Sequence, residues 1–367
     1  MTNYKLSEGS SVLFDLIRGI SAQLVVVGHG FYIFHICDYL RYPYSPGMQN
    51  VAVLIFFLLS GYLISYSTIR KIRSNKLYSI KHYLADRFSR IYTAFIPALI
   101  VVVMIDLISI SIDSEAYRFS QSYNIKSFFG NLLMLQDYPV PKLINEYSIT
   151  NFGSARTFWS LAVEWWIYLF FGFLLLVVRK SKLKFSNLIL LGFLAIVPCY
   201  NLVGGRGDGL TVFWIFGVVA YFLNAYKVLA NVKIGLRLIL FFSLIVAALY
   251  RVYSTMDEYE AVFAFLLALL LAVSVDLFKE IKFSKGFKSV IRFGSGYSYT
   301  LYLVHFSVLD LISSHFTSDS NSPYLLFLLG FIISNLISAI LGYCSELVLT
   351  RKVKVKIYSW IEPKAKI

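Results

Sequence analysis

Long apolar stretches separated by short polar connections run through the whole chain of 367 residues. Most of these stretches are about 20 residues long, which is the length that a helix needs to cross the hydrocarbon core of a bilayer. We expect ten of them to be transmembrane helices, with bounds of 12–34, 51–69, 91–112, 157–178, 187–203, 209–226, 235–250, 259–278, 295–315 and 323–349. The predicted fold class is therefore all-α, a polytopic membrane bundle of about ten transmembrane helices.

Basic residues gather on one side of these expected helices. With an even number of spans both termini lie on the same side, and the segments on that side carry 27 of the 34 Lys and Arg residues. Positive charge accumulates on the cytoplasmic side of membrane proteins, so both termini are predicted to be cytoplasmic. The net charge of +14 then reflects topology and attraction to lipid head groups, and a nucleic-acid partner is not expected.

Composition supports the membrane assignment, since 58% of the residues are hydrophobic and only 15% are charged. Cys37, Cys199 and Cys344 lie far apart and have no metal-binding spacing, so neither a metal site nor a disulfide framework is expected. We divide the chain into a membrane-embedded domain over 1–350 and a basic cytoplasmic tail over 351–367. The first apolar stretch is a poor signal peptide, because charged residues interrupt it.

The connection at about 113–156 is mildly amphipathic and is expected to form a short helix along the membrane interface. The two halves of the chain are not similar to each other, which argues against an inverted-repeat transporter.

Arg18 and His29 lie within the first apolar stretch, where a bilayer makes both costly. Eleven helical steps of about 100° return to within roughly 20° of the start, so both side chains share one face, about 16 Å apart. Asp15, one turn earlier, could pair with Arg18. One interpretation is structural: Arg18 reaches the inner interface and His29 bonds a neighbouring helix. The other is chemical, because a neutral imidazole can take a proton from a hydroxyl.

Two further spans carry groups that are costly in lipid. Glu164 is expected about two turns from the outer face of its span, at a depth similar to that of His29. His305 is expected near the middle or outer half of the ninth span, and Asp310 near its outer end. Each could be a structural tie between helices or a member of an active site.

Arg87 and Arg90 lie one turn apart at the expected cytoplasmic end of the third span. They could be topology anchors, or they could bind phosphate oxygens through their fixed guanidinium donors. Ser60 and Gly61 are small residues in the second span, where close packing of helices is the favoured role.

Together these residues predict group transfer across a bilayer without a metal. An anionic donor would bind at Arg87 and Arg90, and its reacting group would meet His29 beside Glu164 or His305. A transporter or flippase for lipid-linked glycans is the competing class, since it would also place His and Glu in a central cavity. A membrane assembly or sensor protein is a third class, which leaves the alignment of Arg18 with His29 unexplained.

Five strings, in this order, resemble the acyltransferase-3 family, the membrane O-acyltransferases of bacterial surface polysaccharides. They are FDLIRGISAQLVVVGHG, FFLLSGYLI, RFSRIY, FWSLAVEWWIYL and YSYTLYLVHF, and they extend from residue 14 to residue 306. The resemblance implies a bacterial inner-membrane protein that takes an acetyl group from cytoplasmic acetyl-CoA. The implied acceptor is a hydroxyl of a cell-surface polysaccharide, such as a lipopolysaccharide O-antigen or an exopolysaccharide, or of a lipid-linked sugar.

The resemblance also implies roles for individual residues. His29 would be the catalytic base with Arg18 as its companion, and Arg87 and Arg90 would contact the phosphates of acyl-CoA. A second set would line the active-site tunnel; these residues are Glu164, His305, Tyr302 and Ser60.

In the fourth-span motif, Trp165 replaces a second acid of the usual pattern and Trp166 replaces a Gln, which makes Glu164 the sole carboxylate there. Some relatives carry a hydrolase-like domain after the membrane part, and the expectation here is that the membrane domain completes the transfer itself. Direct attack on the thioester and an acyl-enzyme intermediate both remain open.

Overall fold

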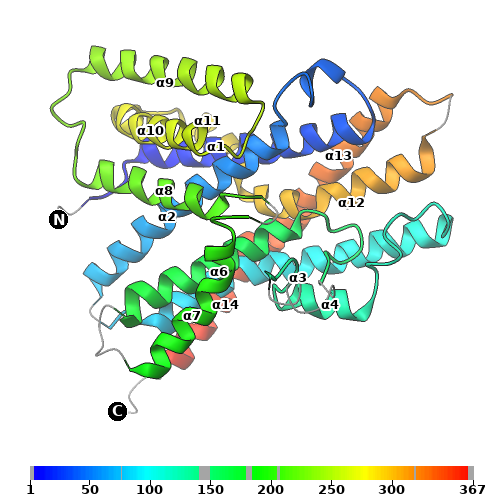
Figure 1. The fold of residues 1–367 in the computed structure, drawn as a ribbon, viewed down its shortest axis with the longest axis horizontal. Helices are drawn as coiled ribbons and strands as arrows, with labels where there is room; N and C mark the ends of the chain where they lie inside the picture. The colour runs from blue at the N-terminus through cyan, green and yellow to red at the C-terminus, as the bar shows by residue number, and fades with distance from the viewer. Residues whose placement is uncertain are drawn as a thin grey trace. The chain divides into compact units, whose positions relative to one another are not determined.

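The computed structural model describes residues 4–75, 77–139, 149–178, 184–204, 207–317 and 320–362, and these are helices joined by turns and loops, without a strand. The predicted all-α fold class is confirmed (Figure 1). The chain divides into two compact units, each built from two separate segments. Unit 1 comprises Met1–Arg70 and Gly207–Ser298, and unit 2 comprises Lys71–Arg206 and Tyr299–Ile367.

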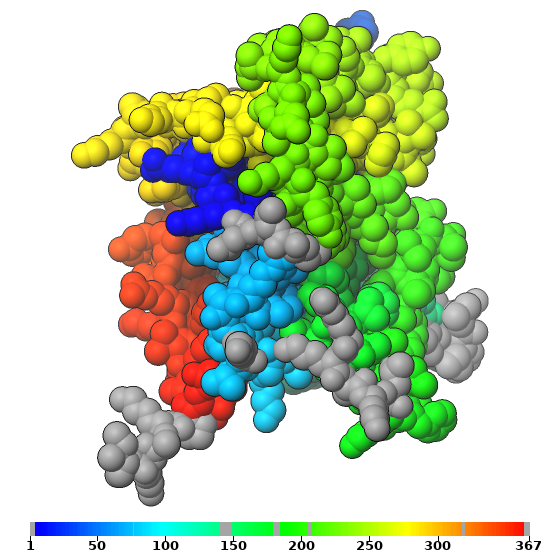
Figure 2. Space-filling view, turned by 90° about the vertical axis from the view of Figure 1, so that its left-hand side faces the viewer, coloured from blue at the N-terminus to red at the C-terminus, as the bar shows by residue number. Residues whose placement is uncertain are grey.

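Unit 1 joins the N-terminal helices to a later group of four. Its helices are α1 (Glu8–Ile33), α2 (Met48–Ser74, up to Arg70), α8 (Leu210–Ala225), α9 (Ile234–Thr255), α10 (Ala261–Leu277) and α11 (Lys285–Gly296). Helix α10 packs against both α8 and α9, and α1 packs against α11. Figure 2 shows the start of α1, in dark blue, against the yellow residues of the α10–α11 region.

Unit 2 joins the middle of the chain to its C-terminal helices. These are α3 (Ile80–Ile112), α4 (Ile125–Leu132), α6 (Phe158–Phe173), α7 (Phe185–Tyr200), α12 (Ser298–Phe316), α13 (Pro323–Gly342) and α14 (Thr350–Ile361). Helix α6 continues as a π-helical turn over Leu174–Val178, and a second π-helical segment, Tyr343–Leu349, joins α13 to α14. Helix α3 packs against both α6 and α14.

Helices occur at all ten places where the hydropathy pattern predicts them. Seven helical segments in the described part of the chain are long and apolar enough to cross a membrane. Helices α7 and α8 are apolar but have only 16 residues each, and α12 is not among the seven. The structure thus supports a membrane protein, and the count of ten spans stays a prediction.

The short helix expected in the 113–156 connection is present as α4, and its place along a membrane interface stays a prediction. Asn124 caps it, because its side-chain oxygen accepts a hydrogen bond from the backbone N–H of Ser127 at 2.8 Å. The basic tail predicted over 351–367 is helical as far as Ile361, and its last five residues lie outside the described part. The division of the chain at residue 350 stays a prediction.

Glycine allows α2 and α8 to pack closely within unit 1. A Cβ atom added at Gly61 would lie 1.9 Å from the carbonyl oxygen of Trp214, and one added at Gly217 would lie 2.1 Å from that of Leu58. Neighbouring Ser60 accepts a hydrogen bond from the indole nitrogen of Trp214 at 3.1 Å. These contacts agree with the packing role expected of Ser60 and Gly61.

We predict that Gly61→Ala lowers the thermal stability of the purified protein. The added methyl group meets backbone atoms that cannot rotate away, and overpacking of this kind costs about 1–3 kcal/mol. Gly192→Ala on α7 is the matched control, because a Cβ atom there has no neighbour within 4 Å. Thermal unfolding in detergent should show a lower midpoint for Gly61→Ala only; equal midpoints would contradict the packing role.

Candidate active site

Helix α1 carries the first pair of predicted site residues without interruption. Ser7 caps its start, because the side-chain oxygen of Ser7 accepts a hydrogen bond from the backbone N–H of Ser10 at 3.1 Å. Arg18 and His29 both lie within the helix and are half-buried. The regular helix keeps them on one face. The expected partner of Arg18 is present, because a guanidinium nitrogen lies 3.5 Å from a carboxylate oxygen of Asp15.

In unit 2, α3 presents Arg87 between two aromatic rings. The guanidinium carbon lies 5.6 Å from the ring centre of Tyr83 and 5.9 Å from that of Tyr168. The negative faces of aromatic rings attract such a cation and hold it in place. Arg87 is therefore fixed in position by packing as well as by charge.

Arg90, one turn further along α3, meets a buried acid from the C-terminal part of the chain. Its guanidinium lies 3.5 Å from Glu346, whose side chain is 1% exposed. The other carboxylate oxygen of Glu346 accepts hydrogen bonds from the backbone N–H and the hydroxyl of Thr300, at 2.9 and 2.8 Å. A guanidinium has five donors, so one contact with Glu346 does not exhaust the binding capacity of Arg90.

Glu164 lies on α6 and is half-buried. The hydroxyl of Tyr168, one turn along the same helix, donates a hydrogen bond to it. Tyr168 also forms one of the two rings around Arg87, so a single side chain connects the acid of α6 to the cation of α3. From the sequence, either a tie between helices or an active-site role was expected for Glu164, and both stay predictions, because the bond from Tyr168 lies within a single helix.

His305 is completely buried on α12. Its Nδ1 donates a hydrogen bond to the carbonyl oxygen of Leu301 at 2.9 Å, since a carbonyl can only accept. This bond fixes the tautomer of the neutral ring and makes Nε2 the nitrogen with the accepting lone pair. Beside it, the hydroxyl of Tyr302 is hydrogen-bonded to that of Ser160 on α6.

The predicted site residues fall into two groups, one in each unit. Unit 1 contains Arg18, His29 and Ser60. Unit 2 contains the others, which are Arg87, Arg90, Glu164, Tyr302 and His305. Within unit 2 the predicted residues come from three helices, α3, α6 and α12. No group of three or more possible metal ligands occurs among the described residues, and whether the reaction uses a metal stays untested.

Several buried acids were not found by reasoning from the sequence. Glu346 is the sole charged residue of the apolar stretch 323–349. A single acid in such a stretch indicates a buried group that needs a partner, so the sequence did contain a signal for it. Asp106 accepts hydrogen bonds from the backbone N–H and the hydroxyl of Ser154. Asp310, by contrast, is a buried acid that the sequence did indicate, and its carboxylate lies 3.8 Å from Arg118.

A third missed acid, Asp86, lies one residue before Arg87 and fastens α14 to α3. Lys354 of α14 lies 2.7 Å from it, and the hydroxyl of Tyr358 donates a hydrogen bond at 3.2 Å. Lys71, in the last turn of α2, and Tyr78, in the connection before α3, also bond to it. Burial, with the negative charge of Asp86 alongside, raises the pKa of Tyr78 far above its ordinary value, so this hydroxyl stays a donor.

Comparison with known proteins gives three similar curated sequences. An O-acetyl transferase of Shigella phage Sf6 is 27% identical over 188 residues, which are 49% of this chain and 52% of that protein. The peptidoglycan O-acetyltransferase OatA of Listeria monocytogenes is 29% identical over 197 residues, which are 50% of this chain and 28% of that protein. An uncharacterized protein of Haemophilus influenzae is 30% identical over 151 residues, which are 40% of this chain and 59% of that protein.

The chain thus spans about half the length of the phage relative and less of the Listeria protein. No solved structure matches it. The family description "Acyltransferase domain" matches residues 12–343, a range that takes in both Arg18 and His29 on α1 and His305 on α12. Since this match covers nearly the whole sequence, the chain belongs to the acyltransferase-3 family.

Proposed function

We propose that this protein is an O-acetyltransferase that moves an acetyl group from cytoplasmic acyl-CoA to a hydroxyl of a cell-surface polysaccharide or lipid-linked sugar. The observation that carries the proposal is the family match over 12–343 together with the stripe of Arg18 and His29 on the unbroken helix α1. The two relatives with assigned names are O-acetyltransferases, one of them acting on peptidoglycan.

In the proposed reaction, His29 removes the proton of the acceptor hydroxyl. The oxygen attacks the thioester carbonyl, the new C–O bond forms and the C–S bond breaks. The CoA thiolate leaves and takes up the proton that His29 held. A positioned imidazole is suited to this exchange because its pKa lies near neutrality in water. The ion pair of Arg18 with Asp15 would place a cation and its counter-ion on the same helix as His29, nearer to the start of α1.

Arg87 and Arg90 are proposed to bind the phosphates of the donor. Two features favour this role over plain topology anchors. The rings of Tyr83 and Tyr168 contact the guanidinium of Arg87, and a carboxylate oxygen of Glu346 lies 3.5 Å from that of Arg90. Prior ordering of both side chains reduces the entropy that binding must overcome. Ordinary anchors would be expected to extend freely into solvent.

The remaining residues of unit 2 are proposed to line the path of the reacting groups. His305 is proposed to line this path as a buried imidazole whose tautomer is fixed by its bond to Leu301. Glu164 and Tyr302 would contribute further polar contacts. The inner bacterial membrane and cytoplasmic termini belong to the same proposal, supported by the asymmetry of Lys and Arg between the two sides.

We expect His29→Ala to abolish acetyl transfer while the protein remains folded. A positioned general base contributes about 10²–10⁴-fold to a rate, so the residual activity should be small. Incubation with labelled acetyl-CoA and isolation of cell-surface glycans measures the transfer. His35→Ala, at an exposed residue just beyond α1, is the matched control. Normal transfer by His29→Ala would remove this residue from the chemistry.

The double variant Arg87→Ala with Arg90→Ala should weaken acyl-CoA binding. Charge-assisted bonds to phosphate are worth about 1.5–3 kcal/mol each, so affinity should fall at least tenfold. Calorimetric titration with acetyl-CoA or with CoA measures the change. The exposed pair Arg70 and Arg73, substituted in the same way, tests whether the loss is specific. Equal affinity in the two double variants would show that Arg87 and Arg90 serve topology only.

A further inference from the structure

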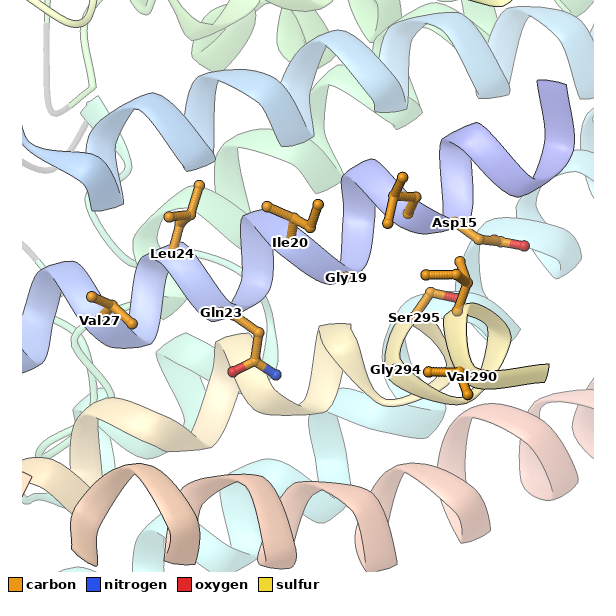
Figure 3. A pocket seen from close by; sticks show the side chains of 11 residues that line it. Asp15, Gly19, Ile20, Gln23, Leu24, Val27, Val290, Gly294 and Ser295 are labelled. Carbon is orange, nitrogen blue, oxygen red and sulfur yellow. The ribbon is translucent and has the colours of Figure 1, made fainter. Parts of the chain in front are cut away.

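A groove runs along α1 on a different face from Arg18 and His29. It has a volume of about 310 Å³ and lies between α1 and α11, both of which belong to unit 1. From α1 it is lined by Asp15, Gly19, Gln23 and Val27, among others, and Gly294 and Ser295 of α11 face them (Figure 3). We call it the α1–α11 groove. Glycines on both helices leave this space empty of side chains.

Helix α11 has the character of a helix that lies in a membrane interface. Hydrophobic side chains are exposed on one side of it, with Val290 at 70% and Phe293 at 66%. On another side, Lys285, Lys288 and Arg292 follow one another at the i, i+3 and i+7 spacing of a single helical stripe. Helices with an apolar face and a basic face bind at the level of the lipid head groups. The groove therefore begins beside a head-group layer.

The length of the groove matches one leaflet of a bilayer. From Asp15 to Val27 the helix rises about 18 Å, and the hydrocarbon thickness of a single leaflet is about 15 Å. Except for Asp15, Gln23 and Ser295, the lining residues are apolar or glycine. A groove of this length and polarity fits an extended acyl chain.

The charges beside the groove favour an anionic head group. Lys288 is paired with Glu8 at 2.8 Å, as Arg18 is with Asp15, so both acids near the groove already have a cation. Lys285 and Arg292 are exposed, and neither forms an ion pair with a residue in the described part of the chain. The basic stripe thus keeps excess positive charge at one edge of the groove.

We propose that the α1–α11 groove binds one anionic glycerophospholipid. An acyl chain lies along α1 from Asp15 towards Val27, and the phosphate lies beside Lys285 and Arg292. Basic sites between membrane helices recognise anionic lipids through this combination of charge and apolar surface. The groove lies on a different face of α1 from Arg18 and His29 and shares only Asp15, the ion-pair partner of Arg18, with the proposed acetyl-transfer site, so lipid binding can be tested without acetyl transfer.

Filling the groove should remove the lipid. Gly294→Leu places a side chain in it, and a Cβ atom at this position meets no other atom within 4 Å, so the fold should tolerate the change. Gly286→Leu is the matched control, since Gly286 is on α11, is equally open and does not line the groove. Gly19→Leu is a second filling variant, where the Cβ atom would make only an ordinary contact of 3.6 Å with Ser295.

Native mass spectrometry of the full chain in detergent, with added phosphatidylglycerol or phosphatidylcholine, measures the binding. We expect the unaltered protein and Gly286→Leu to retain one phosphatidylglycerol in preference to phosphatidylcholine. Both filling variants should lose this lipid while their thermal unfolding remains cooperative. Retention of the lipid by Gly294→Leu and Gly19→Leu, or equal retention of the two lipids by the unaltered protein, would overturn the proposal.

Removing the basic edge should change the preference without closing the groove. Each basic residue near an anionic lipid is worth about fivefold in affinity, so Lys285→Ala with Arg292→Ala should lower the preference for phosphatidylglycerol about 25-fold. Lys227→Ala with Lys279→Ala, at exposed lysines of the same unit, should leave it unchanged. If Lys285→Ala with Arg292→Ala leaves the preference for phosphatidylglycerol unchanged, another occupant covers the groove. A dimer that forms through this face and excludes lipid would show the same.

Discussion

The cost of burying a charge among apolar side chains governs how the helices of unit 2 are connected. An ionised group without a partner is too costly to keep in such surroundings, so each buried acid described above has donors within reach. Glu346 has the backbone and hydroxyl of Thr300 as well as Arg90, and Asp86 has Lys71 and Lys354. These charges connect helices that are distant in the sequence, and one of them, Glu346, lies beside Arg90, which is proposed to bind the donor.

The two arginines of α3 illustrate how a structural contact and a proposed functional one can share a residue. Glu346 and the rings around Arg87 stabilise the fold, and they also hold the guanidinium groups at defined positions. Asp86, the neighbour of Arg87 in the sequence, fastens the C-terminal helix α14 to α3. The N-terminal part of α3 is thus held by two contacts, one with Glu346 and one with helix α14. A binding site for a flexible, highly charged donor gains affinity from such prior order.

Hydropathy alone located a helix at each of the ten apolar stretches, because a long apolar run has few alternatives to a helix in this environment, but it did not indicate α11 or α14. The same pattern predicted α12 as a transmembrane span. The polar residues of this helix lower its mean hydropathy, and it is not among the seven helical segments that are long and apolar enough to cross a membrane. Residues 301–310 of α12 are all buried, so its polar groups face protein and need partners there. The pattern along the chain identified His305 and Glu164 as costly groups. It could not identify the bond from Tyr358 to Asp86, because residues 272 positions apart leave no periodic signal.

The ribosome produces α1 long before the helix that packs against its start, and this delay gives the ion pair of Asp15 with Arg18 a further role. The hydroxyl of Ser10, near the start of α1, donates a hydrogen bond to the carbonyl of Val275, 265 residues later. At about 5–20 residues per second, the ribosome needs on the order of tens of seconds to produce that neighbour. A first helix that spans the membrane must stay there without this neighbour during that interval. A cation that carries its own counter-ion three residues away can do so before any other helix arrives.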